Sequence, residues 1–336
     1  MKEREVIWRA AAELAATGDR GALATVARRR GSLPMASDAK MMVTAAGRRA
    51  GTIGGGCLEA DVIGQALDAM RTGAPALVRH TLNADVAGDL GLSCGGTVEL
   101  FVEPVVNGSH AAALYLAVAE AIAARRRGAV FTAVDWSGGA RKAIRIERET
   151  HGVGDWPAVP AVPAVTAVTM DADAGLLVEP VLRRPRLLVF GAGHVGCEIA
   201  RAAAGTDFHV MVVDDRAEFA NVERLPTADE VVVDDLRAVL DGLVLDEDDY
   251  VIACTRGHAM DALVVERTAA TAARYVGMLG SRRKREVIWK ALAQAGVPRE
   301  ALERVTVPIG EAIGADTPGE IGIAVVAELI RIRRAG

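Results

Sequence analysis

Aromatic residues are scarce in this sequence: they make up 4% of its 336 residues, whereas apolar residues of all kinds make up 51%. The core must therefore be built from Ala, Val, Leu and Ile, which is an ordinary composition for an α/β protein. No apolar run approaches the ~20 residues that a membrane-spanning helix needs, so no membrane segment is predicted. A length of 336 residues, at about 150 residues per domain, predicts two domains.

Basic charge and cysteine are also limited. The formal net charge is −5 and the isoelectric point is near 5.8, which argues against nucleic-acid binding, because that needs a net basic face. Four cysteines without a CxxC pair are too few for a disulfide scaffold. The first 16 residues read as an amphipathic helix rather than a signal peptide. We therefore expect a cytoplasmic protein with reduced thiols.

The pattern of strands and helices changes near residue 182. Residues 1–182 mix strands and helices irregularly and predict a mixed α+β domain, in which Thr150–Thr169 is expected to be an irregular connection. Residues 183–336 alternate strand and helix, which is typical of a Rossmann-like, doubly wound parallel sheet, and the fold class is therefore α/β. Its six predicted strands are Leu187–Phe190, His209–Val213, Val231–Val233, Tyr250–Cys254, Tyr275–Leu279 and Val305–Val307. One short repeat, Arg-Glu-Val-Ile-Trp at 4–8 and 285–289, is interpreted as a coincidence between two amphipathic helices.

A GxGxxG motif follows the first predicted strand of the second half. Such glycines allow a tight turn, a close approach of the backbone to a pyrophosphate, and close packing of helix on strand. Two acids end the next strand, near the spacing at which a carboxylate accepts ribose hydroxyls. The candidate nucleotide contacts are Gly191, Gly193, His194, Gly196, Asp214 and Asp215. The same motif is compatible with a vestigial site or with another adenine- or pterin-bearing ligand.

Further polar residues follow the strands that end at Cys254 and Leu279. In an open α/β sheet, loops at the carboxyl ends of strands border the ligand crevice. Arg256, Arg282 and Lys284 are predicted anion contacts, whereas His258 is either a general acid, a phosphate partner or a surface residue. Asp261 is a possible helix cap. The candidate binding residues in these loops are Thr255, Arg256, His258, Ser281 and Arg282.

Two of the four cysteines lie in glycine clusters: Cys57 follows Gly54, Gly55 and Gly56, and Cys94 precedes Gly95 and Gly96. A soft sulfur on open backbone suits a transition metal or a sulfur atom in transit. The alternative is a pair of glycine turns with unreactive thiols. Cys197 and Cys254 lie in a predicted helix and strand, and are interpreted as small core residues.

Taken together, these motifs resemble those of the XdhC/CoxI family. The resemblance covers nearly the whole chain and is specific in combination. In the first half it rests on Gly31–Pro34, Ala39–Met41, Gly54–Glu59, Ser93–Gly96, Glu99 and Phe101–Pro104. In the second half it rests on Gly191–Gly196, Val212–Arg216, Thr255–Asp261, Gly277–Lys284, Pro308–Gly310, Gly314 and Thr317–Glu320.

The resemblance implies an accessory protein of molybdenum hydroxylases such as xanthine dehydrogenase. Such a protein would bind the molybdenum cofactor, support exchange of an oxo ligand for sulfur with a cysteine desulfurase, and deliver the cofactor to the apoenzyme. It would be a maturation chaperone rather than a catalyst, and it would form a homodimer. Cys57 and Cys94 become candidates for contacting molybdenum or carrying sulfur, and the glycines around them for binding the pterin phosphate. Cys57 also stands at a predicted helix start, where free N–H groups favour the thiolate.

Two residues depart from the family pattern. Met35 and Asp38 stand where family members usually have Arg and Gly. If that Arg holds a phosphate, another cation must do so here. Arg28, Arg29, Arg30 and Lys40 are nearby, and Lys40 is favoured because it matches the family position.

Two other classes of protein remain open at this stage. An NAD(P)-dependent oxidoreductase with an N-terminal substrate domain would account for the residues from Gly191 to Asp215, but not for the glycine and cysteine clusters. It would also lack a recognisable set of residues for hydride transfer. A metal-binding module is disfavoured by the wide gap between Cys57 and Cys94 and by the absence of a His at ligand spacing.

Overall fold

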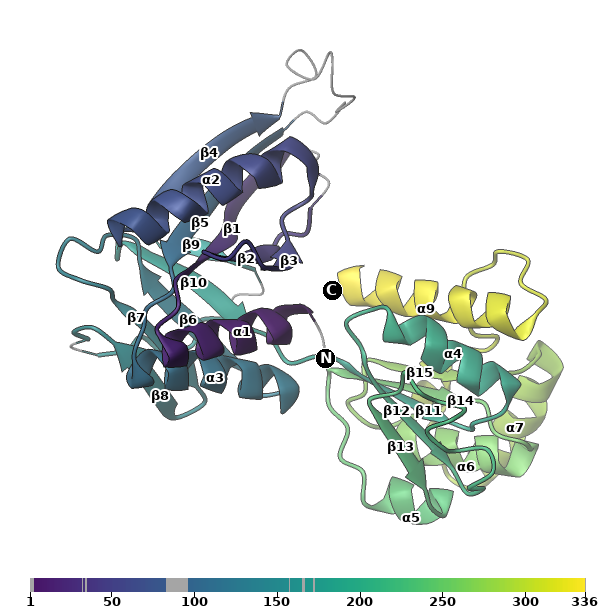
Figure 1. The fold of residues 1–336 in the computed structure, drawn as a ribbon. Helices are drawn as coiled ribbons and strands as arrows, with labels where there is room; N and C mark the ends of the chain where they lie inside the picture. Colours follow the sequence, from purple (N-terminus) through teal and green to yellow (C-terminus); the bar gives the residue numbers. More distant parts are fainter. Residues whose placement is uncertain are drawn as a thin grey trace. The chain divides into compact units, whose positions relative to one another are not determined.

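The computed structural model describes residues 3–31, 33, 35–82, 96–156, 158–164, 167–171 and 173–335. The chain divides into two compact units, Met1–Arg183 and Arg184–Gly336, and each has its own sheets and cores (Figure 1). The predicted α/β class is confirmed, with an α+β first unit and a Rossmann-like second unit.

The first unit contains two five-stranded antiparallel sheets, with strand orders β3-β2-β1-β5-β4 (the first sheet) and β8-β7-β6-β10-β9 (the second sheet). Its elements are α1 (Glu3–Thr17), β1 (Gly21–Gly31), β2 (Lys40–Thr44), β3 (Arg49–Thr52), α2 (Gly56–Thr72), β4 (Ala76–Leu82), β5 (Gly96–Pro104), α3 (Ser109–Ala123), β6 (Gly128–Ala133), β7 (Lys142–Ile146), β8 (Glu149–Val153), β9 (Thr169–Asp171) and β10 (Leu176–Val181).

The two sheets have the same strand order and form an internal structural repeat, which the sequence did not reveal. In each sheet the strand that follows the first helix of the repeat, β1 or β6, lies at the centre. The helices α1 and α3 pack against each other, and the rings of Trp8 and Tyr115 stack with centroids 5.9 Å apart. Both repeats have Val-Glu-Pro-Val at the end of the fifth strand, at 102–105 and at 178–181. We call α1 to β5 the first repeat and α3 to β10 the second repeat.

Four buried charges lie where the repeats meet. Lys40 of the first sheet pairs with Glu179 of the second at 2.9 Å, and Lys142 of the second pairs with Glu103 of the first at 2.5 Å. All four side chains are at most 2% exposed. The lysine Nζ atoms lie 4.6 Å and 5.5 Å from the centroid of the Trp8 ring. Each repeat therefore supplies a cation that the other neutralises, and the pairs tie the two sheets together.

The register of the strands explains why these pairs correspond. Thr25 of β1 lies opposite Lys40, and Thr132 of β6 lies opposite Lys142. Burial by itself would raise the pKa of Glu179, but the ammonium groups of Lys40 and Lys142 outweigh it and hold that pKa below its usual range. The carboxylate is thus kept charged inside the protein.

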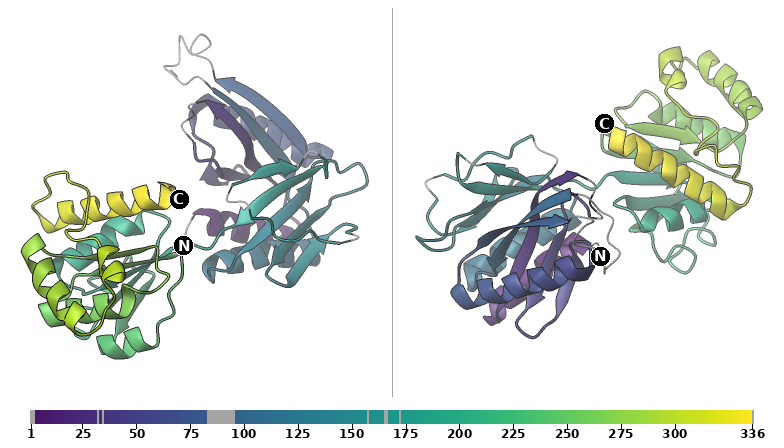
Figure 2. Two further views of the ribbon diagram at one scale, coloured as in Figure 1. Left: turned by 180° about the vertical axis from the view of Figure 1, so that it is seen from behind. Right: turned by 90° about the horizontal axis from the view of Figure 1, so that it is seen from above.

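The second unit is a parallel sheet of order β13-β12-β11-β14-β15. One hydrophobic core lies under α4 and α9, and another under α5, α6, α7 and α8; Figures 1 and 2 show the helices on both faces. The elements are β11 (Arg186–Phe190), α4 (His194–Ala204), β12 (His209–Asp214), β13 (Glu230–Val233), α5 (Leu236–Asp241), β14 (Asp249–Ala253), α6 (His258–Thr268), β15 (Tyr275–Met278), α7 (Arg282–Gln294), α8 (Arg299–Glu303) and α9 (Pro318–Ala335).

Two predicted segments differ from the structure. Val305–Val307 is not a strand: Thr306 makes only an isolated parallel bridge to Gly277, and Pro308 follows, which cannot donate to a ladder. The supposedly irregular Thr150–Thr169 contains most of β8, which pairs with β7. β8 is mostly exposed, so it lacks the apolar alternation by which strands are found in a sequence. Within the described residues, no helix is long and apolar enough to cross a membrane.

Replacing Lys142 by Met should destabilise the first unit strongly, because Glu103 would be left as an uncompensated buried charge. We expect the free energy of unfolding to fall by about 3–5 kcal/mol, and the double variant Lys142→Met/Glu103→Leu to recover most of it. Urea denaturation followed by tryptophan fluorescence measures this, since three of the four tryptophans lie in this unit. Arg126→Met, which breaks exposed pairs with Glu147 and Glu149, should change little. A Lys142→Met variant as stable as wild type would contradict the interpretation.

Candidate functional site

The glycine cluster of the first repeat forms an open turn between β3 and α2. Gly54, Gly55 and Gly56 have φ angles of 114°, 78° and 65°, which residues other than glycine rarely adopt. A Cβ atom at Gly55 or Gly56 would meet nothing within 4 Å. The glycines are therefore required by the backbone conformation of the turn, and the space beside them is left free.

Cys57 lies in the first turn of α2, which confirms its predicted place at a helix start. Its side chain is exposed. The N-cap residue Gly55 offers no side chain to the helix, so the first N–H groups of α2 are available to an anion at the end where the helix dipole is positive. The thiol and these donors are thus presented together. Cys94 and Gly95 lie outside the described residues, and Gly96 is the first residue of β5.

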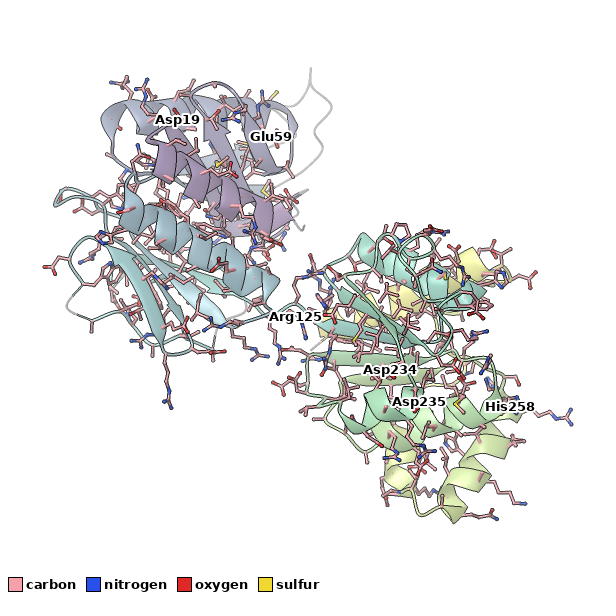
Figure 3. The ribbon with its side chains drawn as sticks, turned by 60° about the horizontal axis from the view of Figure 1, so that its bottom comes forward. Asp19, Glu59, Arg125, Asp234, Asp235 and His258 are labelled. Carbon is pink, nitrogen blue, oxygen red and sulfur yellow. The ribbon has the colours of Figure 1, made fainter. Side chains whose placement is uncertain are left out.

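Glu59 holds the glycine turn. Its Oε1 accepts hydrogen bonds from the Thr52 hydroxyl at 2.5 Å, the Gly55 N–H at 3.2 Å and the Ile53 N–H at 3.4 Å. These bonds, of which the bond from Thr52 contributes most, lower the pKa of Glu59. The sequence showed Glu59 only as part of a motif, and its role in holding the turn is given by these hydrogen bonds. Figure 3 labels Glu59.

The structure corrects the prediction for Lys40. Its ammonium group donates to Thr25 and pairs with Glu179, and its side chain is 1% exposed. It is therefore not available to an external phosphate. Lys40 is the first residue of β2, and its neighbours in the sequence do not indicate that Glu179, 139 residues away, will pair with it.

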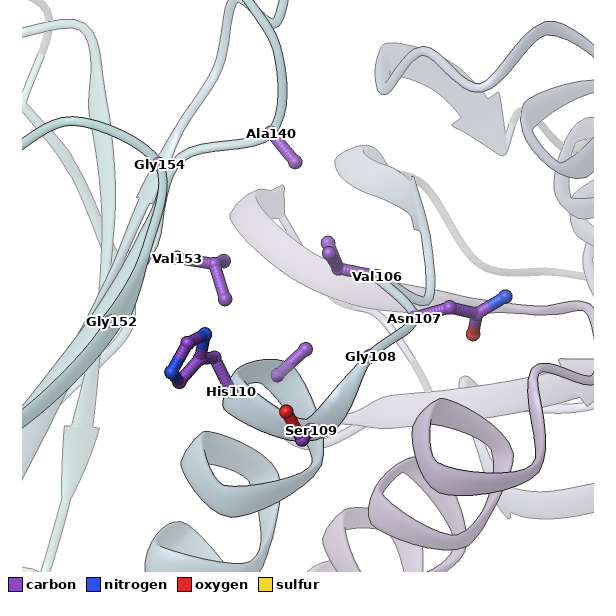
Figure 4. A pocket seen from close by; sticks show the side chains of 10 residues that line it. Val106, Asn107, Gly108, Ser109, His110, Ala140, Gly152, Val153 and Gly154 are labelled. Carbon is purple, nitrogen blue, oxygen red and sulfur yellow. The ribbon is translucent and has the colours of Figure 1, made fainter.

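A cavity of about 500 Å³ lies beside the start of α3 (Figure 4). It is lined by Val106–Ala111, Ala140 and Gly152–Gly154. In the register of the two repeats, Gly152 lies opposite Ala143 as Gly51 lies opposite Met41. The cavity thus lies at the end of β8, where the first repeat has the end of β3 and the start of its glycine turn.

In the Rossmann-like unit, two of the three motif glycines are required by packing. A Cβ atom at Gly191 would collide with the carbonyl of Cys254, and one at Gly196 would collide with the carbonyl of Gly191. Gly193 differs, because a Cβ there would meet nothing within 4 Å. It is the N-cap of α4 and offers no side chain. An open N-cap next to the exposed His194 is the place where a phosphate binds in this fold.

The two acids at the end of β12 have different surroundings. Asp214 is 3% exposed, and its carboxylate accepts from the Ala192 N–H at 2.8 Å and from the Arg216 guanidinium at 2.8 Å and 2.9 Å. Burial alone would raise the pKa of Asp214, but these bonds hold it below its usual value. Asp214 therefore anchors the glycine loop, contrary to the prediction that it accepts ribose hydroxyls. Asp215 is exposed and pairs with Arg256 at 3.0 Å, so it is the acid available to a ligand.

A buried ion pair connects the loops after β14 and β15. Asp261 is fully buried and pairs with Lys284 at 2.5 Å, while its other oxygen accepts from the Thr255 N–H and hydroxyl, both at 2.8 Å. Thr255 and Lys284 are thus engaged within the protein. Contrary to what the sequence suggested, Asp261 does not cap α6, because it lies within the helix and Gly257 is the N-cap. Ser281 also has a structural role, since its hydroxyl accepts from the Lys284 N–H as the N-cap of α7.

The remaining predicted loop residues stay open to solvent. Arg256, His258 and Arg282 are exposed at the carboxyl ends of β14 and β15; Figure 3 marks His258. Arg224 is a contact that the sequence analysis missed: its guanidinium donates to the Ala192 carbonyl at 3.2 Å and helps hold the glycine loop. No motif indicated it, because it lies in an irregular segment 32 residues away in sequence.

Cys197 and Cys254 are core residues, as predicted. Both are 8% exposed, and their thiols lie 3.4 Å from the carbonyl oxygens of Ala192 and Gly191. Burial raises the pKa of both thiols. Among the described residues there is no group of three or more His, Cys, Asp or Glu side chains that could hold a metal ion.

The geometry of the second unit defines a Rossmann-type domain, joined here to a duplicated α+β unit. Comparison with known families agrees: residues 187–329 match the model of the XdhC Rossmann domain, and residues 14–81 match that of the XdhC and CoxI family. The chain belongs to the XdhC and CoxI family.

Two curated relatives and one crystal structure are similar to the chain. It is 27% identical over 315 residues to the uncharacterized protein YqeB of Escherichia coli, covering 93% of this chain but 43% of the relative, so it spans less than half of that protein. It is 25% identical to a probable xanthine dehydrogenase subunit of Bacillus subtilis, over 93% of both chains. The crystal structure, described as a xanthine dehydrogenase from Bacillus halodurans, has a TM-score of 0.79 and 24% identity over 100% of this chain and 96% of that one. It shares the fold.

Replacing Glu59 by Gln should loosen the glycine turn at neutral pH. The lowered pKa means that the folded state favours the carboxylate, so its stabilisation is present above the unfolded pKa near ~4.3 and is lost as pH falls through the lower folded value. We expect a loss of about 1 kcal/mol at pH 7, the usual cost of a helix cap, and a smaller difference at pH 3. Thermal unfolding at both pH values measures this. Glu120→Gln on α3 is the control, and an equal loss at both pH values would exclude a role for the charge.

The glycine motif supplies a matched pair of variants. Gly196→Ala should prevent normal folding of the Rossmann-like unit, because the new methyl group collides with the Gly191 carbonyl. Gly193→Ala should fold like wild type, since its Cβ meets open space. Thermal unfolding by circular dichroism compares the two. Equal destabilisation would contradict the assignment of packing to Gly196 and of open space to Gly193.

Proposed function

We propose that this protein is an accessory protein for a molybdenum hydroxylase of the xanthine dehydrogenase type. It binds molybdenum cofactor as cargo, supports its sulfuration and delivers it to the apoenzyme. Membership of the XdhC and CoxI family and the similarity to a relative named as a probable xanthine dehydrogenase component support this role. The chain carries its chemistry in binding turns, which suits a carrier more than a catalyst.

The observation that carries the proposal is the exposed thiol of Cys57 on a glycine turn. The other cysteines in the described part of the chain, Cys197 and Cys254, are buried. A thiolate is a soft ligand and suits molybdenum or a sulfur atom, whereas the N–H groups at the start of α2 suit an anion. A thiol and anion donors side by side are what a cofactor with both a metal and a phosphate requires.

Each residue of the turn then has a task. Cys57 contacts the metal end of the cargo, and the amides of Gly56 and Cys57 at the start of α2 bind an anionic part of it. Glu59 holds the turn through Thr52 and Gly55, so that these amides are in position before the cargo arrives. Cys94, Gly95 and Gly96 remain proposed contributors by family resemblance.

We also propose that the Rossmann-like unit binds a nucleotide, such as NAD(P), or the nucleotide-like part of the same cargo. Gly193 and His194 would contact its phosphate, and Asp215 with Arg256 would meet its ribose. The open space beside Gly193 supports this, because the protein itself does not require a glycine there. The protein is further proposed to act as a homodimer in the cytoplasm, with the apo molybdenum hydroxylase and a cysteine desulfurase as partners.

Cys57→Ala tests the proposal directly. Wild-type protein should retain molybdenum cofactor through gel filtration, and Cys57→Ala should lose about tenfold or more in retention, since a metal ligand is removed. Cys197→Ala, which removes a buried thiol, should retain it like wild type. With the metal-free pterin, wild type and Cys57→Ala should be equal. No retention by wild type would refute the carrier function, and equal retention of the intact cofactor by all variants would refute the role of Cys57.

The NAD(P)-dependent oxidoreductase is distinguished by calorimetry. Titration of wild type and Gly193→Ala with NAD(H) and NADP(H) reports nucleotide binding at the second unit. An oxidoreductase requires turnover of the bound nucleotide with a small substrate, whereas the carrier requires none.

A further inference from the structure

A basic cavity of about 150 Å³ lies on the first sheet, and none of the functions above uses it. Its lining residues come from three neighbouring strands and are Arg28, Arg30, Arg79, Thr97 and Glu99. We propose that this cavity is a binding site for a phosphate group, and that its ligand is a phosphate monoester or free inorganic phosphate.

The strand register places these side chains together. Arg28 of β1 and Arg79 of β4 both lie opposite Glu99 of the intervening strand β5, and Arg30 lies opposite Thr97. Directly opposite residues point to the same face of a sheet, with Cβ atoms about 4.5–5.5 Å apart. Three guanidinium groups therefore converge on one face.

That face is the one not covered by α2. Val98 and Leu100, the neighbours of Glu99 in β5, are fully buried in the core beneath α2. Side chains alternate along a strand, so Thr97 and Glu99 point to the opposite face. The cavity is accordingly a separate site from the glycine turn at the start of α2.

The charges in the cavity are unbalanced. Among the described lining residues, three arginines face one carboxylate, an excess of two positive charges. Glu99 lies 3.5 Å from Arg28, whose side chain is 48% exposed, so even this pair is loose. Like charges held at opposite positions of a sheet repel one another. A bound dianion would remove that repulsion.

The part of the fold that the two repeats share does not include these arginines. β1 has 11 residues, β5 has nine and β4 has seven, while their counterparts β6, β10 and β9 have six, six and three. The lining residues lie in the extra lengths of these strands, beyond the part that the two repeats share. The strands of the first repeat are thus longer than those of the second where the basic cavity lies.

The donor chemistry selects a phosphate group. A guanidinium presents a planar fork of N–H donors that matches two oxygens of a phosphate, and the Thr97 hydroxyl can donate to a third. A dianionic phosphate balances the excess of two positive charges. The volume equals that of about five water molecules at ~30 Å³ each, which is room for a phosphate group.

Calorimetric titration of the full chain with inorganic phosphate at low salt tests the site. Wild type should bind, Arg79→Gln and Arg28→Gln should each bind about tenfold more weakly, and Glu99→Gln should bind several-fold more tightly because it removes the competing carboxylate. Arg71→Gln, on the exposed surface of α2, is the matched control and should bind like wild type. Circular dichroism checks that every variant is folded.

The opposite effects of the arginine and glutamate variants separate a binding site from a structural role. Tighter binding of glycerol phosphate than of inorganic phosphate assigns the site to an organic monoester, and equal or weaker binding assigns it to free phosphate; either result supports the site. No heat with either probe, or equal affinity in all variants, overturns it. The probes contain neither molybdenum nor pterin, so this result stands apart from the outcome of the cofactor retention experiment.

Discussion

The two buried ion pairs between the repeats are the constraint on which the first unit depends. A buried charge without a partner is strongly destabilising, and each buried lysine forms its ion pair with a glutamate of the other repeat: Lys40 with Glu179, and Lys142 with Glu103. Each sheet therefore depends on the other for the balance of its buried charge. Trp8 and Tyr115 stack beside this cluster at the contact of α1 and α3, so that apolar and ionic contacts both hold the duplicated unit.

The buried side chains at that centre are engaged with one another, and both proposed binding sites lie in parts in which the two repeats differ. The first repeat has a glycine turn and α2 after its third strand, and it has longer β1, β4 and β5. The turn carries the exposed Cys57, and the longer strands carry the arginines. The ends of these strands and the turn contribute little to the core, so their residues can differ between the repeats at little cost in stability.

The same separation holds in the Rossmann-like unit. Gly191, Gly196 and Asp214 serve the packing of the glycine loop, whereas Gly193, Asp215 and Arg256 face outward. All six are among the candidate ligand contacts predicted from the sequence, although the motif glycines were also given roles in the turn and in helix packing. Packing of the loop and binding of a ligand favour the same residue types. The motif alone therefore does not tell which of the two uses a given residue serves.

Local patterns in the chain were enough to predict the α/β class and all five strands of the described parallel sheet. They also predicted the buried state of Cys197 and Cys254 and the helix start at Cys57. These features follow from glycine and apolar residues that act between near neighbours. The internal repeat, the burial of Lys40, the clamp by Glu59 and the convergence of Arg28, Arg30 and Arg79 emerged only in the folded chain. Most of these features depend on contacts between strands that are far apart in sequence. Those contacts determine which charges pair and which side chains are buried, and the neighbouring residues in the chain do not indicate them. A charge is compensated by whatever the fold brings beside it, and that neighbour cannot be read from the residues next to it in the chain.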